Sequence, residues 1–270
     1  MEKKTKKTIL ILGVLLIIAL AMVSYFGAFV ESTYARDDIS MATQGIGQDL
    51  VDLFLVVPLL MIILAMAVKN NRTALLIYNG LLFYVLYSFF IYAFGVHFNQ
   101  MFLLYCAVLG LSLYSFILVT CEMNRMDVVS WFSGKVPTQL TASFFILIAL
   151  MFYLLWFKDV VPAIVNDTVP KTVSDYNLLV NPVHVLDIAI ALPALLITGV
   201  LLFRKHRLAY ILTPVFLVFI IILAIALIGM VLMLKAEGIS DDTSIAWIFT
   251  GLAVISIIVL WMFLQKMKTH

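Results

Sequence analysis

The sequence predicts an all-α integral membrane protein with eight transmembrane helices. Of its 270 residues 64% are hydrophobic and only 12% are charged, and the mean hydropathy is +1.15. A soluble domain of this size cannot bury so much apolar surface, whereas a bilayer accommodates it. The net charge of +2 gives no indication of a nucleic acid partner. The lipid bilayer is therefore the expected environment.

Eight apolar segments follow one another along the chain, each close to the roughly 20 residues that a helix needs to cross a hydrocarbon core. Helices rather than open strands are expected, because a segment in lipid must satisfy its own backbone hydrogen bonds. The predicted segments are 8–30, 49–68, 73–95, 101–121, 138–157, 184–203, 209–234 and 244–264. The connection 122–137 contains Trp131 and Phe132, which we expect to anchor at headgroup depth.

Basic residues predict the orientation. If the N-terminus is cytoplasmic, 13 of the 17 lysine and arginine residues lie inside. The positive-inside rule then places both termini in the cytoplasm. The alternative is that the first segment is a cleaved signal peptide, since Thr33-Tyr34-Ala35 resembles a cleavage site. Its apolar run is longer than the roughly 7 to 15 residues of a signal core, which favours an uncleaved anchor.

The chain resembles itself at an offset of 135 residues, half its length. The matched pairs are Asp52 with Asp187, Pro58 with Pro193, Lys69 with Arg204, and Arg72 with Arg207. Acids outside and bases inside would explain the charges without duplication, but not the prolines. Each half has four helices, so both halves point the same way, as in parallel repeats. We expect a first four-helix repeat at 1–135 and a second at 136–270 with an outer loop at 158–183, although the last helices align only after a shift.

Acidic residues and a histidine mark the predicted outer ends of the second and sixth segments. Asp49 and Asp52 lie three residues apart, as do His184 and Asp187, so each pair shares a helix face. Intramembrane ionisable groups commonly mark function. The structural alternative is that first-turn aspartates cap free amides and interact with the helix dipole.

Further polar residues are predicted at the same level. Asn181 followed by Pro182 predicts a helix start with the asparagine as N-cap. His97 and Asn99 occupy the short outer turn between the third and fourth segments, and tyrosines such as Tyr92 follow on these helices. The tyrosines either line a cavity or, as we favour, lie at the membrane interface. The six expected ligand-binding residues between helices two and six are Asp49, Asp52, His97, Asn99, His184 and Asp187.

Three functional classes fit such a site. Binding or transport of a small polar solute, proton or cation is preferred, because transporters are often built from repeats. A metal-dependent hydrolase is the second class, with His97, His184, Asp52 and Asp187 as metal ligands. A less favoured form of this class has a haem with His97 and His184 as its axial ligands. The third is a non-catalytic scaffold or sensor. The sequence contains no HExxH or Gly-x-Ser-x-Gly motif, so enzymatic activity and cofactor stay undecided, and a homo-oligomer is compatible.

Several short elements resemble a family of bacterial multi-pass membrane proteins without known activity. They are residues 181–187 (Asn-Pro-Val-His-Val-Leu-Asp) followed by Leu192-Pro193, together with Gln48-Asp49-Leu50-Val51, Phe94-Gly95 and Phe98-Asn99. The resemblance covers most of the chain from the second helix onward. It implies a bacterial plasma membrane location and assigns no functional residue.

Overall fold

The computed structural model describes residues 2–133 and 136–268, and the predicted border between the halves, at residue 135, lies outside the described residues. Within these two ranges eight helices are long and apolar enough to cross a membrane. The regular backbone of the same ranges is helical apart from one isolated β-bridge between Phe132 and Met267. The predicted all-helical fold is confirmed, and its eight apolar helices fit a multi-pass membrane protein.

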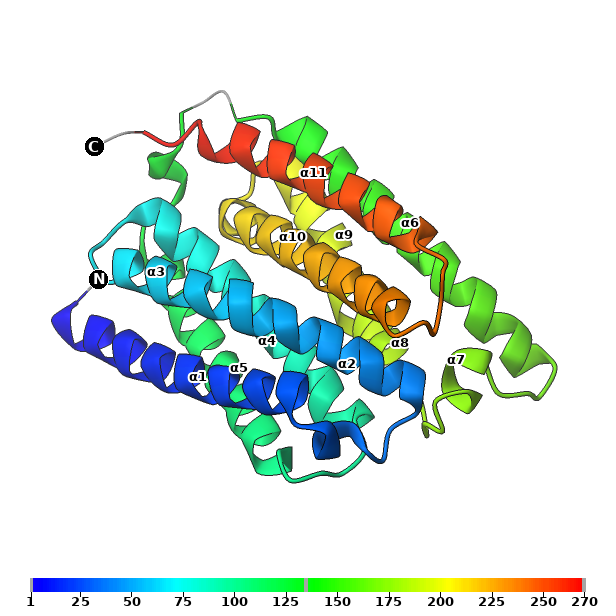
Figure 1. The fold of residues 1–270 in the computed structure, drawn as a ribbon. Coiled ribbons are helices and arrows are strands. Elements are labelled where there is room, and N and C mark those ends of the chain that lie inside the picture. The colour runs from blue at the N-terminus through cyan, green and yellow to red at the C-terminus, as the bar shows by residue number, and fades with distance from the viewer. Residues whose placement is uncertain (1, 134–135, 269–270) are drawn as a thin grey trace. The chain divides into compact units, whose positions relative to one another are not determined.

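Long helices make up most of the chain, together with a few short helical segments (Figure 1). The α-helices are α1 (Lys3–Phe29), α2 (Ile39–Val51), α3 (Val57–Ala67), α4 (Arg72–Gly95), α5 (Phe102–Arg125), α6 (Thr138–Val165), α7 (Lys171–Ser174), α8 (Pro182–Leu186), α9 (Leu192–Phe203), α10 (Arg207–Ala236) and α11 (Ser244–Leu264). The turns are η1 (Glu31–Tyr34) and η3 (Val129–Trp131), which are 3-10, and η2 (Asp52–Val56) and η4 (Asp187–Ala191), which are π-helical. The second span joins α2, η2 and α3, and the sixth joins α8, η4 and α9.

Large apolar side chains are exposed along these helices. Leu103 on α5, Leu154 on α6 and Ile248 on α11 are 78%, 71% and 68% exposed, respectively. Water opposes the exposure of such faces, whereas lipid acyl chains do not. The helix surfaces therefore agree with a bilayer environment.

The chain forms two compact units. Unit 1 comprises residues 2–133 and 136 together with 214–268, and unit 2 comprises residues 137–213. The border between them inside α10 falls before Pro214, a proline within the helix. These units follow packing and do not coincide with the two predicted halves, which stay a prediction.

In unit 1, α4 is the most enclosed helix, and α1 packs against α2, α3 and α5 (Figure 1). Glycines bring backbones close together. A Cβ atom on Gly80 of α4 would lie 3.0 Å from the Val215 carbonyl oxygen of α10. A Cβ on Gly47 of α2 would lie 2.7 Å from the Gly229 carbonyl oxygen, also on α10. Helices in lipid associate through such close packing of small residues.

The segment that follows α5 is buried in unit 1. The Arg72 guanidinium lies 5.4 Å from the centre of the Trp131 ring, and the rings of Phe132 and Phe263 are 5.1 Å apart. Trp131 and Phe132 are 6% and 5% exposed. The expectation that they anchor at headgroup depth is therefore wrong, because both rings pack against protein.

Unit 2 is built around the pair α6 and α9. A Cβ on Gly199 of α9 would lie 3.1 Å from the Ala142 carbonyl oxygen of α6, so this crossing also depends on a glycine. The predicted helix start is confirmed: the Asn181 side chain accepts a hydrogen bond of 2.9 Å from the Val183 amide, and Pro182 occupies the first turn.

Each of the two π turns precedes a proline. The Val57 amide donates to the Asp52 carbonyl oxygen in η2, and the Leu192 amide donates to the Asp187 carbonyl oxygen in η4. Pro58 and Pro193 follow directly, and a proline ring collides with the carbonyl four residues earlier in a regular α-helix. The wider π turn relieves that collision and keeps the span continuous.

Two helix boundaries differ from the prediction by more than five residues. The second span begins at Ile39 instead of residue 49, because Asp38 accepts a hydrogen bond of 2.8 Å from the Ser40 amide and caps the helix. Its first turns hide polar residues on the buried face, which lowers the hydropathy of the segment. The helix α6 continues to Val165 instead of ending at 157, so the connection that follows is shorter than the predicted loop 158–183.

Corresponding elements begin 135 positions apart. This holds for α1 and α6 at Lys3 and Thr138, η2 and η4 at Asp52 and Asp187, α3 and α9 at Val57 and Leu192, and α4 and α10 at Arg72 and Arg207. The last pair, α5 and α11, departs from this spacing, as the sequence alignment does. The repeat itself stays a prediction.

Candidate functional site

Two buried aspartates of the second span face tyrosine hydroxyls in unit 1. Asp49 and Asp52 are each 0% exposed. Asp49 accepts a short hydrogen bond from the Tyr34 hydroxyl and one of 3.2 Å from Tyr92. Asp52 accepts a hydrogen bond of 2.8 Å from the Tyr84 hydroxyl. We call these five residues the carboxyl cluster.

The α1–α2 connection positions Tyr34. The Thr33 hydroxyl donates 2.8 Å to the Phe26 carbonyl oxygen, which folds η1 back onto the end of α1. Gly27 leaves the space that the Asp49 carboxylate and the Tyr34 hydroxyl fill. Burial, and next the Asp49 carboxylate, raise the pKa of Tyr34 well above its ordinary value. Tyr34 therefore stays a neutral donor.

The cluster reaches the middle of the span. Asp52 lies 13 residues after Ile39 and 15 before Ala67, which at the α-helical rise is about 20 Å from either end. Its partner Tyr84 lies 12 residues after the start of α4 and 11 before its end. The expectation that Asp49 and Asp52 stand in the first turn of a helix is wrong, because the helix starts ten residues before Asp49. Capping of free amides therefore cannot explain them.

The carboxyl cluster contains no basic residue. Within the described part of the chain, the ion pairs join His97 to Asp37, Arg125 to Glu122 and His184 to Asp159. An isolated carboxylate inside a low-dielectric region is costly, and hydroxyl donors offset only part of that cost. Binding of a positive charge therefore stabilises the buried Asp49 and Asp52, and the smallest such charge is a proton.

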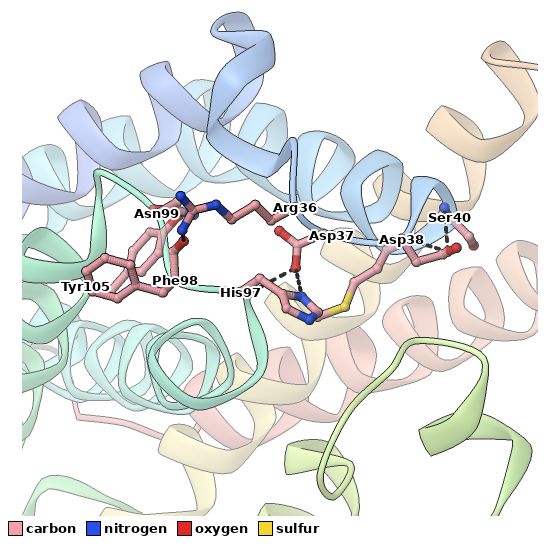
Figure 2. A network of polar contacts seen from close by, with 9 residues as sticks. Arg36, Asp37, Asp38, Ser40, His97, Phe98, Asn99 and Tyr105 are labelled. Atoms are coloured by element: carbon pink, nitrogen blue, oxygen red, sulfur yellow. Dashed lines mark hydrogen bonds and ion pairs between the residues drawn. The ribbon is translucent and has the colours of Figure 1, made fainter.

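His97 and Asn99 lie in the turn between α4 and α5, and His97 and the Phe98 carbonyl of this turn contact the α1–α2 connection (Figure 2). The His97 amide donates 2.9 Å to Asp37 Oδ1, and its ring Nδ1 lies 2.8 Å from the same oxygen. Arg36 donates 2.7 Å to the Phe98 carbonyl oxygen. Asn99 donates 3.1 Å to the Tyr105 hydroxyl. The turn thus ties down the connection that carries Tyr34.

Replacement of Asp37 tests whether its contacts with His97 stabilise the α1–α2 connection. The Asp37 side chain is 1% exposed, and Asp37→Ala leaves the His97 amide without its acceptor. We expect the free energy of unfolding to fall by about 1–3 kcal/mol, measured as a lower thermal unfolding midpoint in detergent. Asp37→Asn keeps an acceptor and should lose less. The exposed Asp241→Ala is the control, and an equal loss in that variant would contradict the tie.

His184 and Asp187 form a separate cluster in unit 2. The Trp156 indole N–H donates 2.8 Å to Asp187 Oδ2, and the centre of its ring lies 4.7 Å from that of His184. His184 Nε2 lies 3.7 Å from Asp159 Oδ2. Trp156 and Asp159 both lie on α6, and Asp159 does so because this helix continues past residue 157.

The six predicted residues thus have distinct local partners. Asp49 and Asp52 share the carboxyl cluster, His97 pairs with Asp37, and Asn99 bonds Tyr105. His184 and Asp187 meet through Trp156. Residues 2–133 and 136–268 contain no group of three histidine, cysteine or acidic side chains that could hold a metal ion. The assignment of all six residues to one binding site stays a prediction.

Sequence reasoning missed Tyr34, Asp37, Trp156 and Asp159. Nothing in the hydropathy pattern marks them, since each makes its contact with a residue on another element. It also favoured a membrane-interface role for the tyrosines, whereas Tyr84 and Tyr92 are buried and bond carboxylates.

Comparison with family models, with curated proteins and with solved structures finds no match for this chain. We therefore infer its function from the chemistry of the side chains in place.

Proposed function

We propose that this membrane protein binds a proton at Asp49 and Asp52 and passes it across the bilayer. The observation that carries the proposal is the complete burial of two carboxyl groups, of which Asp52 lies at mid-span, without a basic partner in the described residues. Ionisable groups placed at this depth are characteristic of proton relays in pumps and transporters.

The tight packing favours a proton over a larger solute. Asp49 and Tyr34 already fill the space beside Gly27, where even a methyl group would collide with them. The hydroxyls of Tyr34, Tyr84 and Tyr92 donate to the carboxylates. A proton needs no volume of its own, whereas a hydrated cation or polar solute needs a cavity.

A row of polar side chains supports a proton route to the carboxyl cluster. Asn99 bonds Tyr105, whose ring packs edge-on against Tyr92 with centres 5.5 Å apart, and Tyr92 bonds Asp49. Asp52 follows one turn further along the span. If the predicted orientation holds, this route starts at the outer surface.

Beyond the cluster, buried polar groups continue along α4. The Asn79 amide donates 2.9 Å to the Thr120 hydroxyl of α5, and both Asn79 and Tyr78 are 0% exposed.

The π turn η2 begins at Asp52 itself. π turns are frequent at functional sites, and in this proposal a change of the turn switches which side of the membrane Asp52 faces.

Reconstituted vesicles test the proposal. Full-length protein is placed in liposomes that contain a pH-sensitive dye, and a potassium diffusion potential drives proton entry. We expect the wild type to acidify the lumen faster than empty vesicles and Asp52→Asn to match empty vesicles, because the amide cannot bind and release the proton. Asp52→Glu keeps a carboxyl group and should retain part of the flux.

The matched control is Asp127→Asn, an exposed aspartate in the connection after α5. It should transport like the wild type. Wild-type flux equal to that of empty vesicles, or full flux in Asp52→Asn, would contradict the proposal.

A further inference from the structure

Unit 2 contains a polar cluster that the proposed function does not use. His184 is 7% exposed, and its Nε2 makes no hydrogen bond within the described residues. This nitrogen lies 3.7 Å from Asp159 Oδ2. Asp159 also accepts a hydrogen bond of 2.7 Å from the Thr172 hydroxyl of α7. A buried, unpartnered nitrogen beside a carboxylate is an open acceptor site.

The positions of this cluster match those of the carboxyl cluster at the offset of 135 residues. His184 corresponds to Asp49, and Asp159 corresponds to Ser24, which lies beside Asp49 in unit 1. In each unit the same two positions of the paired spans therefore meet. In unit 1 the acid of the pair is Asp49 on the second span, whereas in unit 2 it is Asp159 on α6.

We propose that unit 2 carries its own proton-binding site, in which His184 and Asp159 share one proton. With the ring hydrogen on Nδ1, the proton adds to the free lone pair of Nε2, and the imidazolium then faces the Asp159 carboxylate. No other bond changes, and the net charge of the pair becomes zero. The site takes its proton from water, because the Asp159 side chain is 33% exposed.

The groups that face His184 agree with this assignment. Asp159 and Trp156 come from α6, and α7 contributes the Thr172 hydroxyl. Asp187 lies one turn after His184 on the sixth span. Asp187 is engaged by the Trp156 indole N–H. Among the described residues, His184 and Asp159 belong to no group of three histidine, cysteine or acidic side chains that could hold a metal ion, whereas structural metal sites hold more than two ligands.

Trp156 provides an optical readout, because an imidazolium in contact with an indole quenches its fluorescence. The difference between wild type and Trp156→Phe isolates this residue from the other three of the chain's 4 tryptophans. As the pH falls from about 8 to about 5, the range in which histidines titrate, we expect the Trp156 emission of full-length protein in detergent to fall with one midpoint.

Variants assign the titration. His184→Gln should abolish the pH-dependent change. Asp159→Asn should move the midpoint about one pH unit lower, because the lost carboxylate no longer favours the imidazolium. His206→Gln, an exposed histidine between α9 and α10, should leave the midpoint unchanged. Circular dichroism confirms that each variant is folded.

Three results would overturn the assignment: emission independent of pH, an unchanged titration in His184→Gln, or an unchanged midpoint in Asp159→Asn. Stoichiometric Zn²⁺ binding that is lost in His184→Gln would also overturn it, because the site would then hold a metal. None of these results depends on Asp49 or Asp52, so this proposal and the vesicle experiment fail independently.

Discussion

Gly27→Ala is expected to lower the thermal unfolding midpoint by about 5–10 °C and to abolish proton flux. The added Cβ would overlap the Asp49 carboxylate and lie 2.7 Å from the Tyr34 hydroxyl. Overpacking of a filled interior costs about 1–3 kcal/mol, and each kcal/mol lowers the midpoint of a chain of this size by roughly 2–4 °C. Circular dichroism in detergent and the vesicle assay provide the two measurements.

Gly110→Ala is the matched control. Gly110 also lies within a helix, but a Cβ there has nothing within 4 Å. This variant gains helix propensity without a collision and should keep the wild-type midpoint or exceed it. Equal destabilisation in both variants would show that glycine itself, and not the space beside Asp49, matters.

A double variant separates fold from function. Asp49→Ala removes the carboxylate that Gly27→Ala strikes, so the pair of substitutions should recover part of the lost midpoint. Flux should stay absent, because the proton-binding group is gone. Recovery of both would contradict the role proposed for Asp49.

Gly47→Val is expected to have the largest effect on stability of unit 1. Its Cβ would lie 2.7 Å from the Gly229 carbonyl oxygen and 2.8 Å from Met230 Cα. Both are backbone atoms of α10, so no side-chain rotation relieves the contact and the helices must separate. We expect a loss of several kcal/mol, seen as a strongly reduced midpoint or as failure to purify folded protein.

The opposite glycine allows a finer test. A Cβ on Gly229 would lie 2.6 Å from Val51 Cγ2, a side-chain atom, and 3.0 Å from the Gly47 carbonyl oxygen. Val51→Ala should therefore partly rescue Gly229→Ala but not Gly47→Ala. Gly251→Val on α11, where a Cβ meets nothing within 4 Å, is the control. Rescue of Gly47→Ala by Val51→Ala would show that the backbone contact is not limiting.

Hydropathy predicted the spans better than their ends. Apolar runs locate eight helices, because a single segment in lipid can satisfy its own backbone hydrogen bonds only as a helix. Hydropathy does not reveal the start of α2, since Thr43, Gln48 and Asp49 are polar yet buried on its inner face. The cap by Asp38 was a local signal that could have located it.

The candidate site was predicted only in part. Asp49 and Asp52 stand out because acids are rare in apolar segments, and Asn181 before Pro182 predicts a cap. Tyr34 lies 15 residues before Asp49 in a different element, and Trp156 lies 31 residues before Asp187. No periodicity links such pairs, so they emerge only when the helices pack.

The sequence by itself determined the membrane class, the number of apolar helices and the two prolines beside which the π turns form. These properties are local, since the hydrophobicity of a segment and the ring of a proline act on the chain nearest to them. The tertiary structure alone decided that Asp49 and Asp52 are fully buried and that tyrosines rather than bases surround them. Burial and hydrogen bonding depend on which helices meet, and that is a property of the packed units.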